Sequence, residues 1–201
     1  IALDHSSVKA IVGFIKDITQ EHKNELAIQH QSKMQQLLMM IASQYINLPL
    51  ERVDDSIQES LSAIGQFVAA DRAYVFSFDH QQHAASNTYE WCAEGISPQI
   101  DQLQEIPLEM APELITDLFQ GKSSYIDDVS HLPEGEQRSL LESQDIKSLI
   151  AVPMIHLGQC IGFVGFDAVR KARPFSTEEQ QILHLFAQLL VNVQLRSDTQ
   201  Q

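Results

Sequence analysis

Apolar residues recur at helical spacing in three segments of the chain. Over 21–48 they alternate at intervals of four and three residues, the heptad pattern of a long helix that pairs with another helix. A second amphipathic segment follows Pro49 and ends near Val68. The last begins at Ser176, where an S-x-x-E sequence ending at Glu179 predicts a capping box. The heptad positions are Ala27, Gln31, Met34, Leu38, Ile41, Tyr45 and Leu48.

The heptad segment predicts a parallel homodimer, since an identical helix is the simplest partner for a narrow apolar stripe. The alternative is an ordinary amphipathic helix that docks on its own domain, because a heptad pattern of 28 residues is short for a coiled coil. The positions predicted to form the centre of the dimer contact are Met34, Leu38, Ile41 and Tyr45.

Five further segments have the composition of β-strands. The segment 8–19 is rich in β-branched and aromatic residues and predicts a strand before the long helix. Segments 72–79 and 87–93 alternate aromatic with smaller residues and predict a hairpin. Segments 148–157 and 160–169 are strongly apolar and predict two central strands joined by a tight turn.

The segment 94–145 lacks a regular pattern and contains four prolines, with short helical pieces and a brief strand at 124–126. A long irregular connection over a sheet often carries function. The order of elements predicts an α+β fold. We expect a central antiparallel sheet with the N- and C-terminal helices on one face, and crossover loops with short helices on the other.

Charge and composition disfavour two classes of function, binding to nucleic acid and binding to membranes. The chain has 13 Lys and Arg against 27 Asp and Glu, a formal net charge of −14, which repels nucleic acid and anionic membrane surfaces. No apolar run is long enough to cross a bilayer. Cys92 and Cys160 lie in apolar contexts, which predicts buried, reduced thiols and a cytoplasmic location.

The sequence shows no motif for catalysis. It contains neither of the glycine-rich phosphate-binding motifs, G-x-x-x-x-G-K-[ST] and G-x-G-x-x-G. Its eight histidines do not have the spacing of a zinc site. No nucleophile stands beside a base in a recognisable pattern. We therefore expect a regulatory module without enzymatic activity or a bound metal.

Three motifs in order resemble a GAF domain: IKSLIAVPM at 146–154, IGFVGF at 161–166, and FSTEE at 175–179 opening the last helix. The resemblance covers about residues 46–196. The sequence GFIKDITQE at 13–21 is similar to the last strand and exit of a PAS domain.

These resemblances imply an order of domains along the chain. Residues 1–20 would be the end of a PAS domain, and residues 21–48 a linker signalling helix. Residues 49–196 would be the GAF domain, and residues 197–201 the start of a linker to an output domain.

The sequences of these motifs are similar to those of GAF domains in bacterial multidomain sensors. The output domains of such sensors are diguanylate cyclases (GGDEF), EAL phosphodiesterases or histidine kinases. The resemblance implies a relay that controls such an output, with a small-molecule pocket beneath the crossover 94–145. That segment has no cysteine, so a covalent tetrapyrrole is not expected, while haem or a nucleotide stays open. The alternatives are a ligand-free dimerisation and spacer domain and, less favoured, a thiol-dependent methionine sulfoxide reductase.

Six residues are candidates for lining this pocket because they are aromatic or polar and fall on strands or crossover pieces near it. Each has a plain structural alternative, such as a core aromatic residue, a turn cap or a solvated charge. The candidates are Tyr89, Trp91, Tyr125, Asp127, Arg138 and His156.

Overall fold

The computed structural model describes residues 5–46 and 48–199, and the side chains of residues 20–46 and 48–193. The chain divides into two compact units, Ile1–Met40 and Ile41–Gln201. The first unit is helical, and the second contains all six strands of the sheet.

Helix α1 spans His5–Ile46 as one continuous element. The prediction of a strand over 8–19 is therefore wrong. β-Branched residues favour a strand only where a neighbouring strand pairs the backbone, and the described part of this unit contains no strand. A helix satisfies its own backbone hydrogen bonds without such a partner. The similarity of 13–21 to a PAS exit remains an interpretation of the sequence alone.

The sheet of the second unit is antiparallel throughout, with strand order β3-β2-β1-β6-β5-β4. The hairpin predicted at 72–93 and the central pair predicted at 148–169 are both confirmed, and they meet through the β1–β6 pairing. The strands are β1 Arg72–Asp79, β2 Ala84–Cys92, β3 Ile106–Pro107, β4 Ser124–Ile126, β5 Ser148–His156 and β6 Gln159–Ala168.

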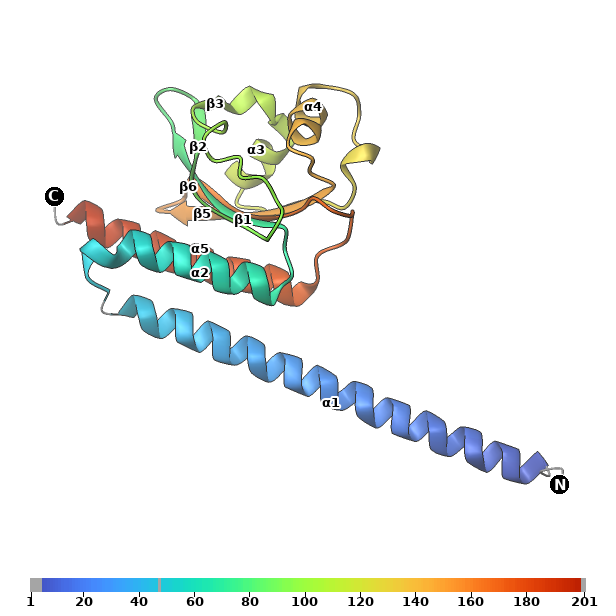
Figure 1. Cartoon of the computed structure of the whole chain (residues 1–201). Coiled ribbons are helices and arrows are strands. Elements are labelled where there is room, and N and C mark those ends of the chain that lie inside the picture. The colour runs from blue at the N-terminus through green and yellow to red at the C-terminus, as the bar shows by residue number, and fades with distance from the viewer. Residues whose placement is uncertain (1–4, 47, 200–201) are drawn as a thin grey trace. The chain divides into compact units, whose positions relative to one another are not determined.

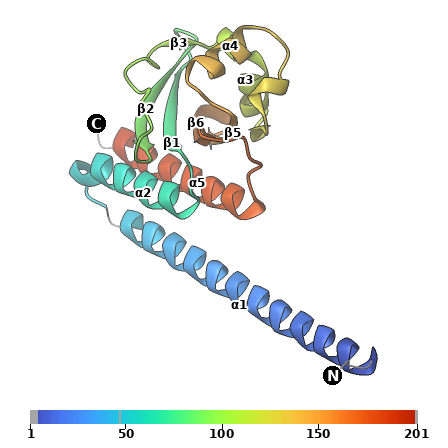
Figure 2. The same ribbon diagram turned by 45° about the vertical axis from the view of Figure 1, so that its right-hand side comes forward.

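Helices α2 (Val53–Phe67) and α5 (Thr177–Thr199) lie side by side on one face of the sheet (Figures 1 and 2). The predicted capping box of α5 is confirmed. The Glu179 N–H donates to Ser176 Oγ at 3.2 Å, and the Ser176 N–H donates to Glu179 Oε2 at 2.6 Å. These bonds satisfy two backbone donors at the helix start.

The crossover between β2 and β5 covers the opposite face of the sheet, above β1 and β6 in Figure 1. It contains α3 (Pro112–Phe119) and α4 (Glu136–Ser143), together with the short strands β3 and β4. Its three-residue helical turns are Leu108–Met110 and Val129–His131, and a similar turn, Leu50–Arg52, precedes α2. The predicted α+β fold is thus confirmed.

A buried apolar cluster fills the space between sheet and crossover and includes Phe76, Leu118 and Phe163. A second set of buried side chains, among them Leu61 and Phe186, lies on the helix side of the sheet. Over the helices that the structure describes, none is long and apolar enough to cross a membrane.

Candidate ligand pocket

A cavity of about 80 Å³ lies between the sheet and the crossover. The Phe76 and Phe163 rings are stacked in its wall, with centroids 4.7 Å apart and planes 6° apart. The Tyr74 ring meets the Phe76 ring edge-on at 5.6 Å. The sheet adds Ala85 and Leu149, and the crossover supplies the rest of the apolar wall: Leu103, Ile106, Pro107, Leu108, Ala111, Leu114, Ile115, Leu140, Leu141 and Ile146.

The polar lining of the cavity comes from Asn87, Glu90, Gln144 and Asp167. Asn87 is 2% exposed, and its Nδ2 donates to Glu90 Oε1 at 3.4 Å. Its Oδ1 is buried without a hydrogen-bond partner. Glu90 is fixed by the crossover, because its Oε2 accepts from the N–H of Gln99 at 2.8 Å and of the next residue at 3.1 Å.

A buried charge cluster adjoins this polar wall. Arg72 is 2% exposed, and its Nη1 lies 3.5 Å from Asp167 Oδ2. Its remaining nitrogens donate to the carbonyl oxygens of Ser97 at 3.2 Å and Gln144 at 2.9 Å, so one side chain ties both ends of the crossover to the sheet. The Tyr74 hydroxyl donates to Asp167 Oδ1 at 2.8 Å.

Burial raises the pKa of Asp167 to about 7, against the opposing effects of the Tyr74 hydrogen bond and the Arg72 charge. Burial, with the nearby Asp167 charge, also raises the pKa of Tyr74 well above its usual value. The Tyr74 hydroxyl therefore stays protonated near neutral pH and remains a donor to Asp167.

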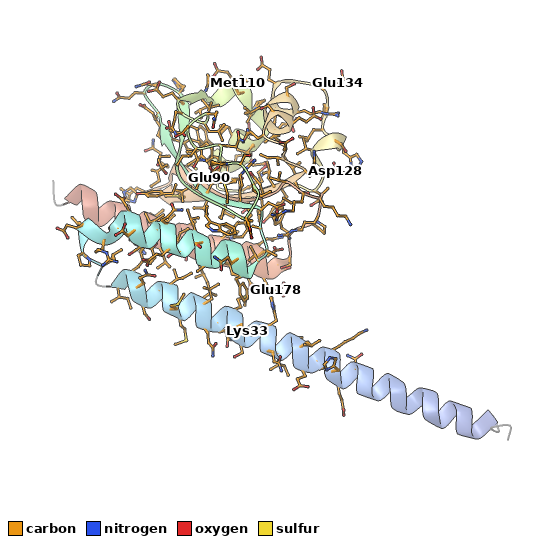
Figure 3. The ribbon with its side chains drawn as sticks, viewed as in Figure 1. Lys33, Glu90, Met110, Asp128, Glu134 and Glu178 are labelled. Atoms are coloured by element: carbon orange, nitrogen blue, oxygen red, sulfur yellow. The ribbon has the colours of Figure 1, made fainter. Side chains whose placement is uncertain are left out.

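A β-bulge in β2 decides which side chains face the cavity. Val75 pairs with Tyr89 whereas Phe76 pairs with Asn87, so Thr88 is the extra residue on β2. Asn87 and Glu90 consequently lie on the same face of the sheet although they are three positions apart. Figure 3 labels Glu90 among the side chains of the second unit, which contains the sheet.

The bulge also explains where Tyr89 and Trp91 lie. Both project toward α2, and neither lines the cavity. The Tyr89 hydroxyl donates to Asp54 Oδ1. Trp91 packs over Gly65, where an added Cβ would lie 2.3 Å from the indole ring. Trp91 therefore packs between sheet and helix, and Tyr89 bridges to α2.

The other four candidates also lie away from the cavity lining. Tyr125 is exposed and its hydroxyl donates to Gln180 of α5, while Asp127 is exposed at the end of β4. Arg138 lines a separate surface depression near α4 and pairs with Glu142 at 2.7 Å. His156 is half-buried at the turn end of β5. Tyr125 lies on the short strand β4, Asp127 and His156 lie at strand ends, and Arg138 lies on α4, so none of these elements directs its side chain into the cavity.

The two thiols lie in environments that disfavour the thiolate. Burial raises the pKa of Cys92 to about 11 and also raises that of Cys160, whose Sγ donates to the Gly162 carbonyl oxygen at 3.2 Å. Both are free cysteines. Protonated thiols are poor nucleophiles near neutral pH.

The predicted dimer positions divide between the two units. Met34, which is buried, and Leu38, which is half-buried, belong to the first unit, and Ile41 and Tyr45 are buried in the second. The Tyr45 hydroxyl donates to Ser60 Oγ of α2 at 3.2 Å. This end of the stripe therefore packs within its own domain, as the alternative interpretation of the heptad segment predicted.

The chain is 29% identical over 200 residues to the methanogenesis regulatory histidine kinase FilI of Methanothrix harundinacea (strain 6Ac). The match covers 98% of this chain and 22% of the relative, so the chain spans about a fifth of that protein's length. This relative is archaeal, whereas the sequence motifs resemble those of bacterial sensors.

Solved structures share the fold at low sequence identity. A protein solved in its far-red-absorbing dark state with bound biliverdin is 14% identical in sequence. Its TM-score is 0.66 over 81% of this chain and 99% of that chain. The GAF domain of a Coxiella burnetii phosphoenolpyruvate-protein phosphotransferase is 15% identical, with a TM-score of 0.66 over 83% and 95%.

The PixJ GAF domain of Thermosynechococcus elongatus is 22% identical, with a TM-score of 0.61 over 77% of this chain and 94% of that chain. A profile of the GAF domain matches residues 52–193, more than half of the chain, and the chain therefore belongs to the GAF domain family.

Proposed function

We propose that this chain is the small-molecule-sensing domain of a histidine kinase, and that it is not itself an enzyme. The relation to a regulatory histidine kinase over nearly the whole chain supports this output above a GGDEF cyclase or an EAL phosphodiesterase. Two free cysteines with raised pKa values support a reducing, cytoplasmic setting and disfavour thiol-dependent methionine sulfoxide reduction.

The observation that carries the sensing role is the cavity itself, which has apolar walls and a few polar groups at its edge. This is the composition of a small-molecule site. Its volume of about 80 Å³ suits a ligand of a few non-hydrogen atoms, since a cavity of about 150 Å³ holds benzene. A tetrapyrrole is far larger, and no cysteine or histidine lines the cavity to hold one.

The second candidate function is a ligand-free spacer domain. The stacked rings of Phe76 and Phe163, with Tyr74 edge-on against them, fill much of the space beneath the crossover and favour this alternative. The two functions differ in one measurable respect, because only a ligand-binding domain is stabilised by mass action.

A thermal-shift screen of nucleotides, amino acids, haem and small organic molecules tests the sensing role. A ligand at a hundred times its Kd adds about 2.7 kcal/mol of stability, which raises the Tm of a domain of this size by about 5–10 °C. Ala111→Leu places a larger side chain in the cavity wall and is expected to abolish the shift. Gln181→Leu, on the exposed face of α5, is the matched control and is expected to keep it.

Loss of the shift in Ala111→Leu alone locates the ligand in this cavity. A shift that survives Ala111→Leu places binding elsewhere. No shift with any compound contradicts the sensing role and favours the spacer domain.

We further propose that α1 mediates a homodimer that relays the signal to the output. Its exposed apolar side chains include Ile28, Met39 and Met40, which support contact with a second helix. Ligand binding would be coupled to the output only if it favours one of two helix arrangements.

Light scattering at micromolar concentration tests the dimer. Met39→Glu puts a charge among these exposed apolar side chains and is expected to halve the measured mass. His30→Glu introduces the same residue at an exposed position on the opposite side of the helix, nine residues before Met39, and is expected to leave the dimer intact. A wild-type chain that is monomeric at every concentration would rule out this role for α1.

A further inference from the structure

Each side-chain donor group of the cavity's polar wall already makes one hydrogen bond, whereas one acceptor makes none. The Tyr74 hydroxyl donates to Asp167, Asn87 Nδ2 to Glu90, and Gln144 Nε2 to the Leu140 carbonyl oxygen at 3.0 Å. A carboxylate or phosphate ligand would also meet the Glu90 carboxylate, which lines the cavity and repels an anion.

Asn87 Oδ1 is the acceptor left without a partner in this wall. The bond from Nδ2 to Glu90 fixes the orientation of the amide, so the oxygen and not the nitrogen is the group without a partner. Asn87 is 2% exposed and lines the cavity. A buried acceptor of this kind destabilises the fold unless a donor meets it, which makes it an independent indication of a ligand.

A second buried polar atom without a hydrogen bond, Arg72 Nη1, does not compete for the ligand. Arg72 is not among the residues that line the cavity, and this nitrogen faces Asp167 Oδ2 at 3.5 Å. Its charge is therefore directed at Asp167 and not at the cavity.

Charge and aromatic faces favour a cationic donor over a neutral one. Glu90 lines the cavity, and so do the rings of Tyr74, Phe76 and Phe163, whereas the Asp167 carboxyl is paired with Arg72. The Glu90 carboxylate attracts an ammonium group, and aromatic faces attract cations. A neutral alcohol would gain from neither attraction to the same extent.

We propose, building on the sensing role above, that the ligand is a small organic ammonium compound. Its N–H groups donate to Asn87 Oδ1 and face the Glu90 carboxylate. Its apolar body lies against Phe76 and Phe163. The cavity volume of about 80 Å³ limits this body to a short alkyl or similarly small group.

Three probes of matched shape test the proposal: n-butylammonium, 1-butanol and butyrate, titrated at pH 8 by calorimetry and thermal shift. We expect n-butylammonium to bind at least tenfold more tightly than 1-butanol, and butyrate to bind least. Asn87→Leu is expected to weaken n-butylammonium binding at least tenfold. Asn192→Leu, at an exposed position on α5, is expected to leave it unchanged.

Glu90→Gln provides a second variant that preserves the shape of the site. It is expected to reduce n-butylammonium binding severalfold while binding of 1-butanol stays the same. Equal or tighter binding of 1-butanol or butyrate by the wild type overturns the ammonium class. So does an absence of n-butylammonium binding when another compound of the wider screen binds in the cavity. If no compound binds at all, the sensing role fails with it.

Discussion

Replacing Arg72 with Met is expected to lower the free energy of unfolding by about 3–5 kcal/mol at pH 8, the cost of removing one partner of a buried ion pair. The change leaves the Asp167 carboxyl buried without its cation. It also removes the donors to the carbonyl oxygens of Ser97 and Gln144, which frees both ends of the crossover from the sheet. Urea denaturation followed by circular dichroism measures the loss.

The pH dependence of this loss identifies its cause. In the folded wild type, burial raises the pKa of Asp167 from 3.8 to about 7, with Arg72, Tyr74 and Glu90 as the charged or titratable neighbours. The folded chain holds this proton more tightly, so the Asp167 contribution to stability falls as pH rises from about 4 to about 7 and then levels off. Without Arg72 the pKa rises further, and the fall continues above pH 7.

The difference between Arg72→Met and wild type is therefore expected to be largest above pH 8 and smaller near pH 5, where the loss of the hydrogen bonds to Ser97 and Gln144 remains. Adding Asp167→Asn to Arg72→Met removes the carboxyl and is expected to remove this pH dependence. Arg52→Met is the matched control, because Arg52 and Asp55 form an exposed pair and such pairs contribute about 0–1 kcal/mol. An equal loss at pH 5 and pH 8.5 would show that charge is not the cause.

Gly162→Ala is expected to destabilise the domain by about 3 kcal/mol, at the upper end for overpacking a well-packed core. A Cβ at this position would lie 2.1 Å from the carbonyl oxygen of Phe76 and 3.2 Å from the Cα of Ser77. Both atoms belong to the β1 backbone and cannot rotate away, so β1 and β6 must separate. Differential scanning calorimetry is expected to show a Tm lower by about 6–12 °C.

Gly135→Ala serves as its control. Nothing lies within 4 Å of a Cβ built on Gly135, and its φ of 166° is extended backbone open to any residue. Its Tm is expected to stay within about 2 °C of the wild type, as is usual for surface substitutions. Equal shifts in the two variants would mean that the close approach of β1 and β6 does not limit stability.

The sheet and its covering helices could be predicted because their patterns are local. The alternation at 72–79, the apolar runs at 148–169 and the capping box at Ser176 each specify an element with few alternatives. The strand prediction at 8–19 failed because strand propensity depends on a pairing partner, which a local pattern does not reveal. The same β-branched residues continue the helix that follows them.

The polar wall of the pocket could not be predicted, although one signal was present. Asp167 stands inside the apolar strand 160–169, where a carboxyl requires buried partners. Its partner Arg72 lies 95 residues away in sequence and becomes a neighbour only through the β1–β6 pairing. Asn87 and Glu90 were missed because strict alternation along β2 places Asn87 with Tyr89 and Trp91 on one face.

The extra residue at Thr88 has an evolutionary consequence. Thr88 sets the boundary between two sets of side chains, Asn87 ahead of it and Tyr89 to Trp91 behind it. Loss of Thr88 would remove the bulge and restore regular alternation, with Glu90 still on the face of Asn87 and Tyr89 and Trp91 still on the other, because the bulge already takes Thr88 out of the pairing. A GAF domain of this kind can therefore lose this residue through a single-codon deletion and still present the same side chains to a ligand.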